Sequence, residues 1–124
     1  MNILILMGNL GRDPEMRYTP QGKAVTNFSI AINRGSGENR STLWVKCVAW
    51  ERTAEFAAEY LRKGMRVIVE GWLDEEEWTE KESNKRISRP RCNVRNITIA
   101  DRREREEREE REDDLKEELT GLPF

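Results

Sequence analysis

Residues 41–50, STLWVKCVAW, place two indoles and an ammonium group at alternate positions. Side chains two residues apart share one face of an extended strand, so Trp44, Lys46 and Trp50 lie together with Val48. The opposite face carries apolar residues that suit a core: Leu43, Val45, Cys47 and Ala49. Exposed aromatic rings beside cations can stack unpaired bases and bind phosphates. Exposed Trp is also common at subunit interfaces, so the pattern leaves both interpretations open.

A second unusual stretch is GWLDEEEW at residues 71–78, where four consecutive acids separate two tryptophans. Alternation places one group on one strand face: Trp72, Asp74, Glu76 and Trp78. The other face carries Leu73, Glu75 and Glu77. Downstream, five cations follow a plausible turn at Ser83-Asn84: Lys85, Arg86, Arg89, Arg91 and Arg95.

This arrangement predicts a long hairpin over residues 73–95 with one acidic and one basic arm. Acids would pair with the hairpin's own arginines across the ladder, at about 0.2–1 kcal/mol per pair. A metal site is the less favoured alternative, because a metal needs carboxylates that converge from separate segments rather than four that alternate between faces.

The sequence contains no histidine. This removes the usual activators of Ser and Cys nucleophiles and the usual zinc ligands, so we expect neither an enzyme nor a metal or other cofactor. Cys47 and Cys92 are isolated, and we expect reduced thiols buried in strands, although the sequence leaves a disulfide between them open. No apolar run approaches the roughly 20 residues of a membrane span, which predicts a cytoplasmic protein.

The net charge of −2 conceals two regions of opposite sign. Residues 1–100 hold 16 Lys/Arg against 13 Asp/Glu, whereas residues 101–124 hold 6 against 11. The length of 124 residues fits one domain with a modest core. We therefore expect a weakly basic domain at 1–100 and an acidic, mixed-charge tail at 101–124. Pairs spaced i, i+4, such as Glu107–Arg111, predict that the tail is helical.

Hydrophobic periodicity supplies the elements that would position these residues. It predicts strands at 3–7, 25–33, 41–50, 65–73 and 92–100. The first strand is expected to be buried and to end at the turn GNLG. The segment 53–64 is expected to form a helix that ends with Gly64 at the C′ position. The proline-containing segment 13–24 is expected to be mostly loop. Predicted inward-facing residues are Thr26, Phe28, Ile30, Ile32, Val67, Val69 and Leu73. This order predicts an all-β fold with one short helix, the five-stranded Greek-key barrel of the OB-fold, with a long hairpin between strands four and five.

Two longer segments carry a resemblance to a known family. ILMGNLGRDPEMRYTPQGKAVTNFSIA (5–31) and LWVKCVAWERTAEFAAEYLRKGMRVIVEG (43–71) are similar to the bacterial single-stranded DNA-binding proteins, over roughly residues 2–100. The resemblance implies an OB-fold that binds single-stranded DNA without base specificity. It also implies a homotetramer, with a dimer as the other option.

The resemblance implies roles for individual residues. Base-stacking positions of the family fall on Trp44, Trp50 and Trp78. Positions that commonly carry phosphate-binding cations fall on Lys46, Arg52 and Lys63, and we add Arg86 of the basic arm as a further DNA-binding candidate. The last residues, Leu122-Pro123-Phe124, resemble the tip of the family's acidic tail, which implies docking of replication and repair proteins.

The sequence departs from the family pattern in four places. The loop GSGENRS lacks the usual aromatic residue, and Val45 stands where relatives often have His near a subunit contact. The tail lacks a long Gly/Gln/Pro-rich linker. The acids of 74–77 replace a basic run before Trp78. We therefore expect binding to depend more on tryptophan stacking and less on charge than in relatives with the basic run.

These features are compatible with three functions to different degrees. The first is non-enzymatic, sequence-independent binding and protection of single-stranded DNA in replication, recombination and repair. The protein would then lie in the cytoplasm near the nucleoid, and its gene could belong to a bacterium, a phage or a plasmid. The second is an OB-fold adaptor of the primosomal kind, acting mainly through protein contacts, which the acidic run and the missing loop aromatic favour. The third, a metal-dependent nuclease built on 74–77, lacks a second convergent cluster of acids and is least favoured.

Overall fold

Six strands and one α-helix form the body of the chain in the computed structural model, which describes residues 1–101 and 110–117. The elements are β1 (Leu4–Leu10), β2 (Glu15–Tyr18), β3 (Ala24–Arg34), a 3₁₀ turn (Gly37–Asn39), β4 (Ser41–Trp50), α1 (Glu51–Tyr60), β5 (Arg66–Thr79) and β6 (Arg86–Ile99). The sheet order is β1-β5-β6-β4-β3-β2. Pairing of Asn9 and Leu10 with Ala31 and Ile30 closes the barrel between β1 and β3. This closed barrel, with the helix between β4 and β5, confirms the predicted OB-fold.

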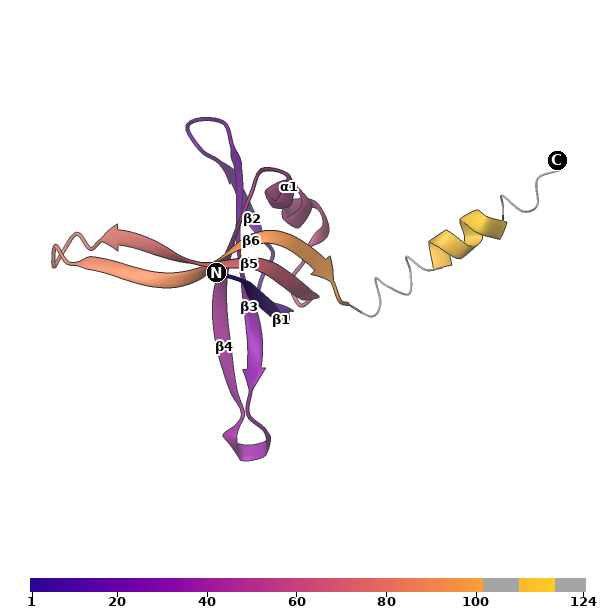
Figure 1. Cartoon of the computed structure of the whole chain (residues 1–124), viewed down its shortest axis with the longest axis horizontal. Coiled ribbons are helices and arrows are strands. Elements are labelled where there is room, and N and C mark those ends of the chain that lie inside the picture. The colour runs from indigo at the N-terminus through magenta and orange to yellow at the C-terminus, as the bar shows by residue number, and fades with distance from the viewer. Residues whose placement is uncertain (102–109, 118–124) are drawn as a thin grey trace.

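Two long hairpins project from the barrel in different directions: β3–β4 points downward in Figure 1 and β5–β6 points to the left. The two hairpins meet where β4 runs parallel to β6, with Cys47–Ala49 paired to Cys92–Val94. Because this parallel ladder is only three residue pairs long, the hairpins diverge beyond it. The body is thus a small barrel with two arms.

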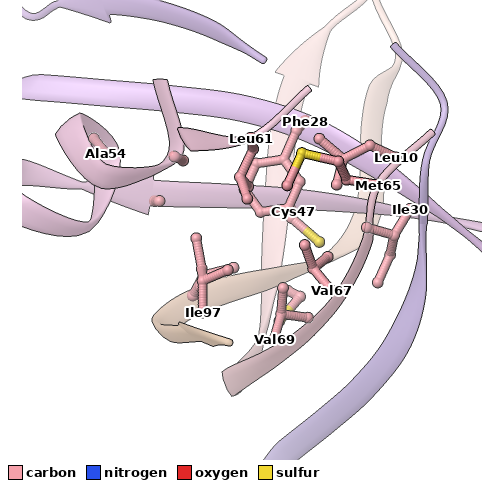
Figure 2. Close-up of a cluster of buried hydrophobic side chains, with 14 of the residues drawn as sticks. Leu10, Phe28, Ile30, Cys47, Ala54, Leu61, Met65, Val67, Val69 and Ile97 are labelled. Carbon is pink, nitrogen blue, oxygen red and sulfur yellow. The ribbon is translucent and has the colours of Figure 1, made fainter. Parts of the chain in front are cut away.

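The core lies inside the barrel and beneath α1, as Figure 2 shows. Phe28, Ile30, Val67 and Val69 point inward, which confirms the predicted faces of β3 and of the first half of β5. Ala54 and Leu61 cover the core from the helix side. The helix is also attached to β3 by a hydrogen bond, because the buried Thr26 Oγ1 donates to the Ala54 carbonyl oxygen at 2.7 Å.

The two cysteines lie opposite each other in the parallel ladder, both fully buried and both free. The hydrogen bond with Cys92 and burial raise the pKa of the Cys47 thiol. A neutral, buried thiol is a poor nucleophile. Cys47 and Cys92 are therefore core residues, in agreement with the expectation of reduced thiols.

A β-bulge separates the barrel half of β5 from the projecting arm. Glu70 pairs with Asn96 and Gly71 pairs with Val94, which leaves Arg95 as the extra residue. Only glycine fits at position 71, because a Cβ atom there would lie 1.8 Å from the Asn93 carbonyl oxygen. The bulge therefore marks where the strand pair turns away from the core.

The arms explain why several residues predicted to face a core are exposed. Leu73 lies beyond the bulge and Leu43 lies on the projecting part of β4, and they are 54% and 41% exposed. Val48 differs from its prediction in the opposite sense. Alternation places it on the exposed face with Trp44 and Trp50, but the residue is buried. It lies in the middle of the sheet, between Asn27 of β3 and Asn93 of β6.

Element boundaries differ from the prediction at three places. Segment 13–24 is mostly loop and turn, as predicted, but Glu15–Tyr18 within it pairs with β3 as an additional strand, β2. β1 continues through the predicted turn to Leu10, and it is half-buried rather than buried. The helix occupies Glu51–Tyr60, so Gly64 does not end it but lies in the following turn with φ +86°.

Residues 110–117 of the tail form an exposed helix. The predicted tip, Leu122-Pro123-Phe124, lies outside the described residues, as does Glu107 of the predicted helical pair. In the described parts of the chain, no helix has the length and apolar character needed to cross a membrane.

Candidate nucleic-acid interface

All four tryptophans of the sequence lie on one face of the sheet. Asn93 of β6 is paired with Val48 on one side and with Trp72 on the other, so these three side chains share a face. Alternation extends this face along β4 to Trp44, Lys46 and Trp50, and along the arm to Asp74, Glu76 and Trp78. We call this surface the tryptophan face. Trp44, Trp50 and Trp78 are 59%, 38% and 38% exposed, so rings remain available for stacking.

Trp44 and Trp50 lie beside other elements of the barrel. The Trp44 ring lies against Gly11, where an added Cβ atom would approach the ring to 2.5 Å. Trp50 is the last residue of β4 and directly precedes α1. With Lys23 and Arg52 it lines a groove of about 600 Å³ between the β2–β3 turn and the first turn of the helix. Arg52, a predicted phosphate contact, is thus adjacent to Trp50.

Lys46 is not a free cation on this face. Its Nζ donates to Glu76 Oε2 at 2.7 Å, which bridges the β3–β4 hairpin and the β5–β6 arm. Glu76 was expected to pair with an arginine of its own hairpin, and that expectation is wrong. Cys92 pairs with Cys47 of β4 on one side and with Leu73 of β5 on the other, so the start of the arm lies beside the part of β4 that carries Lys46, on the face that Glu76 shares.

The other cations of the tryptophan face are also engaged. Arg91 Nη2 lies 3.2 Å from Asp74 Oδ2, as the hairpin prediction required. The guanidinium of Arg89 lies 5.3 Å from the ring centroid of Trp78, and that of Arg95 lies 5.6 Å from the ring centroid of Trp72. The face therefore combines four indoles with cations that already have partners in the free chain.

Asp74 is the centre of a small polar network on this face. Its pKa is held below the ordinary aspartate value by the backbone N–H of Glu75, and further by hydrogen bonds from Asn93 and Arg91. Asn93 Nδ2 donates to Asp74 Oδ2 at 3.3 Å. Asn93 Oδ1 is buried and has no hydrogen-bond partner among the described residues.

The opposite face of the arm carries its own interactions. Arg86 forms an ion pair with Glu77, and Ser88 Oγ donates to Glu75. The Arg86–Glu77 pair confirms the predicted neutralisation within the hairpin. Arg86 itself, a predicted DNA-binding residue, faces away from Trp78, because Trp78 is paired with Ile87 and neighbouring residues alternate.

The structure brings together Trp44, Lys46, Trp50 and Trp78, with Arg52 beside Trp50. Lys63 lies in the loop after α1, where its backbone N–H donates to Asp13 Oδ1 at 2.8 Å. Among the described residues, no group of three or more His, Cys, Asp or Glu side chains is arranged to hold a metal ion.

Sequence reasoning did not select Trp72, Arg89 or Arg95 as site residues. The alternation from Trp72 to Trp78 was a usable signal for the first. The position of Arg95 depends on the bulge, which the sequence did not reveal.

A closed five-stranded barrel with an exposed aromatic face and interleaved cations defines the OB-fold class of single-stranded nucleic-acid-binding proteins. The family model described as the single-strand binding protein family matches residues 1–100. The chain belongs to this family, and its general activity is the binding of single-stranded DNA.

Proposed function

We propose that this protein coats and protects single-stranded DNA in replication, recombination and repair, without enzymatic activity and in the cytoplasm near the nucleoid. The observation that supports this proposal is the tryptophan face, on which four indoles share one side of the sheet. Base stacking contributes about 1–3 kcal/mol per ring and does not depend on base identity. Trp44, Trp50 and Trp78 are the proposed stacking residues, with Lys46, Arg52 and Lys63 as proposed cationic contacts. Arg86 is proposed as the weakest contact, because it lies on the opposite face of the arm and is paired with Glu77.

Tryptophan fluorescence titration with oligo-dT at several salt concentrations tests this function. We expect quenching by the single strand and little response to duplex of the same length, because stacking requires unpaired bases. The salt dependence should be shallow, because Lys46 and Arg91 are already paired with carboxylates. Absence of quenching and of binding at low salt would refute the proposal.

An adaptor function is the second candidate, supported by the same paired cations. An adaptor of this kind would bind single strands only weakly and act through protein contacts. The titration separates the two functions, because a DNA-coating protein must saturate oligo-dT at physiological salt, whereas an adaptor would not.

Self-association, as a homotetramer or a dimer, is proposed to use β1. Ile5 and Met7 on its outer face are 63% and 55% exposed, and Ile3, directly before the strand, is 68% exposed. β1 pairs with β3 only at Asn9 and Leu10, which leaves an edge of Leu4–Gly8 open in the single chain. An exposed apolar strand with an open edge favours pairing with a second copy. Sedimentation of Ile5→Glu should show smaller particles than wild type, and unchanged particles would exclude β1 as the interface.

The tip Leu122-Pro123-Phe124 is proposed to recruit replication and repair proteins. A terminal aromatic ring next to a free carboxylate suits an apolar pocket with a basic rim, and the upstream acids would steer the encounter. Deletion of the tip should abolish recruitment in pull-downs from host extract while oligo-dT affinity is kept or slightly raised. Identical partner sets with and without the tip would refute this role.

A further inference from the structure

We propose that Trp72 and Arg95 form a further nucleotide subsite in the middle of the tryptophan face. A base would stack on the Trp72 ring, and Arg95 would bind the adjacent phosphate. The inference rests on the proposed binding of single-stranded DNA and adds a contact between Trp50 at one end of the face and Trp78 on the arm.

The register of the strands places Arg95 between two indoles. Val94 of β6 lies opposite Ala49 of β4 in the parallel ladder. One residue further along each strand, Arg95 and Trp50 therefore leave the sheet on the same face. On the other side of Arg95, its guanidinium lies 5.6 Å from the ring centroid of Trp72. A phosphate bound by Arg95 would thus lie between bases stacked on Trp50 and on Trp72.

The backbone at Arg95 is held by the strand pairing around the bulge and by a hydrogen bond from α1. Arg95 is the extra residue of the bulge, and its carbonyl oxygen accepts a hydrogen bond from Thr53 Oγ1 of α1 at 3.3 Å. Thr53 follows Arg52, so the subsite adjoins the groove that Trp50 and Arg52 line. The Arg95 side chain is exposed and can turn from the ring to a phosphate without disturbing this backbone.

Asn93, the ladder partner of Trp72, supplies an unused acceptor beside the ring. Its Nδ2 donates to Asp74, which fixes the orientation of the amide and leaves Oδ1 as the acceptor. Oδ1 is buried without a partner among the residues that the structure describes. Because Oδ1 is shielded in the unbound chain, the edge of a stacked base could supply the missing donor only after the side chains that cover the atom move on binding. Each natural base carries such an N–H group, so this contact is compatible with binding that does not depend on sequence.

A purely structural role for Trp72 makes a different prediction. An indole that only shields the bulge could be replaced by another large apolar side chain, aromatic or not. A stacking platform needs an aromatic ring. Trp72→Leu and Trp72→Phe therefore separate the two roles, provided that thermal melting shows both variants to be folded.

The experiment measures oligo-dT binding by anisotropy of labelled DNA for wild type, Trp72→Leu, Trp72→Phe and the reference variant Trp44→Leu. We expect Trp72→Leu to weaken binding at least about fivefold, the lower end of one lost stacking contact, and Trp72→Phe to retain most of the affinity. Arg95→Gln should lower the slope of log affinity against log salt by about 0.7, the value for one phosphate contact to a single strand.

The reference variant distinguishes failure of the subsite from failure of the proposed function. If Trp44→Leu weakens binding but Trp72→Leu and Arg95→Gln match wild type, the subsite is refuted and the proposed function stands. If wild type does not bind oligo-dT, the proposed function itself is refuted. If Trp72→Leu does not fold, the fluorescence of Trp72→Phe decides. Loss of a stacked indole lowers the absolute fluorescence change on DNA binding, so a change equal to that of wild type would mean that Trp72 does not stack on DNA.

Discussion

The two faces of the β5–β6 arm carry acids from the same run, but they connect to different parts of the molecule. On the tryptophan face, Glu76 reaches Lys46 of β4, whereas on the opposite face Glu77 pairs with Arg86 of its own hairpin. The first ion pair joins two hairpins across the candidate DNA surface. The second stabilises the arm alone. Acids that are neighbours in sequence can therefore have unrelated consequences, because strand alternation assigns them to different surfaces.

The consequence for binding is a competition on one face only. A phosphate that approaches Lys46 must displace the Glu76 carboxylate, and one that approaches Arg91 must displace Asp74. Stacking on the tryptophan rings requires no displacement of a carboxylate. Arg89 must move off the Trp78 ring, and Arg95 off the Trp72 ring, before a base can stack there. Stacking should therefore dominate the affinity and charge should modulate it.

Loss of a ring should have the largest effect. Trp78→Ala should weaken oligo-dT binding by about 5- to 150-fold, the equivalent of 1–3 kcal/mol for one stacked base. Glu75→Ala on the opposite face of the same arm is the control and should leave the affinity near that of wild type. Anisotropy titration of labelled oligo-dT measures both. Equal losses for the two variants would mean that the arm acts through its overall stability rather than through its tryptophan face.

Removal of the competing carboxylate should have a smaller effect of opposite sign. Glu76→Gln should raise oligo-dT affinity severalfold and steepen the salt slope by about 0.7, because Lys46 becomes free to bind one phosphate. Glu77→Gln makes the same change of charge one residue away on the other face. It should alter the affinity much less. Equal gains would show that net charge, not position on the tryptophan face, controls binding.

The polar network of Asp74 should give a modest dependence of stability on pH. The pKa of Asp74 is lowered in the folded protein, so its charged form stabilises the fold above the unfolded value of about 3.9. This stabilisation is lost as pH falls through the lower folded pKa. The melting temperature of Asp74→Asn should therefore lie below that of wild type at pH 7, and the difference should shrink in acid below about pH 4. A difference that stays constant down to low pH would contradict the assigned network.

The smallest effect is expected for the exposed arginine of the opposite face. Arg86→Gln should change the free energy of unfolding by less than about 1 kcal/mol, because its pair with Glu77 is solvent-exposed. Its effect on the salt slope should be smaller than that of Arg89→Gln, whose guanidinium lies on the tryptophan face. A larger slope change for Arg86→Gln would show that DNA also passes along the other side of the arm.

Much of the fold followed from the sequence by itself. Hydrophobic alternation predicted the faces of β3 and the burial of Val67 and Val69. The acidic and basic segments predicted the long hairpin and the pairing of acids with its own arginines, and the structure forms two such pairs, Asp74–Arg91 and Glu77–Arg86. These features depend on a period of two within a strand and on pairing across a nearby turn, and both are local properties of the chain.

The tertiary structure alone decided where the arms leave the barrel, and with it the details of the site. The bulge at Gly71 exposes Leu73 and places Arg95 over Trp72. The parallel ladder between β4 and β6 places the base of the arm beside β4, so that Glu76 meets Lys46, 30 positions away in the sequence. Alternation tells which residues share a face of one strand, but not how far a strand remains over a core or which distant strand its face meets. Those outcomes depend on twist, bulges and packing between segments that are far apart along the chain.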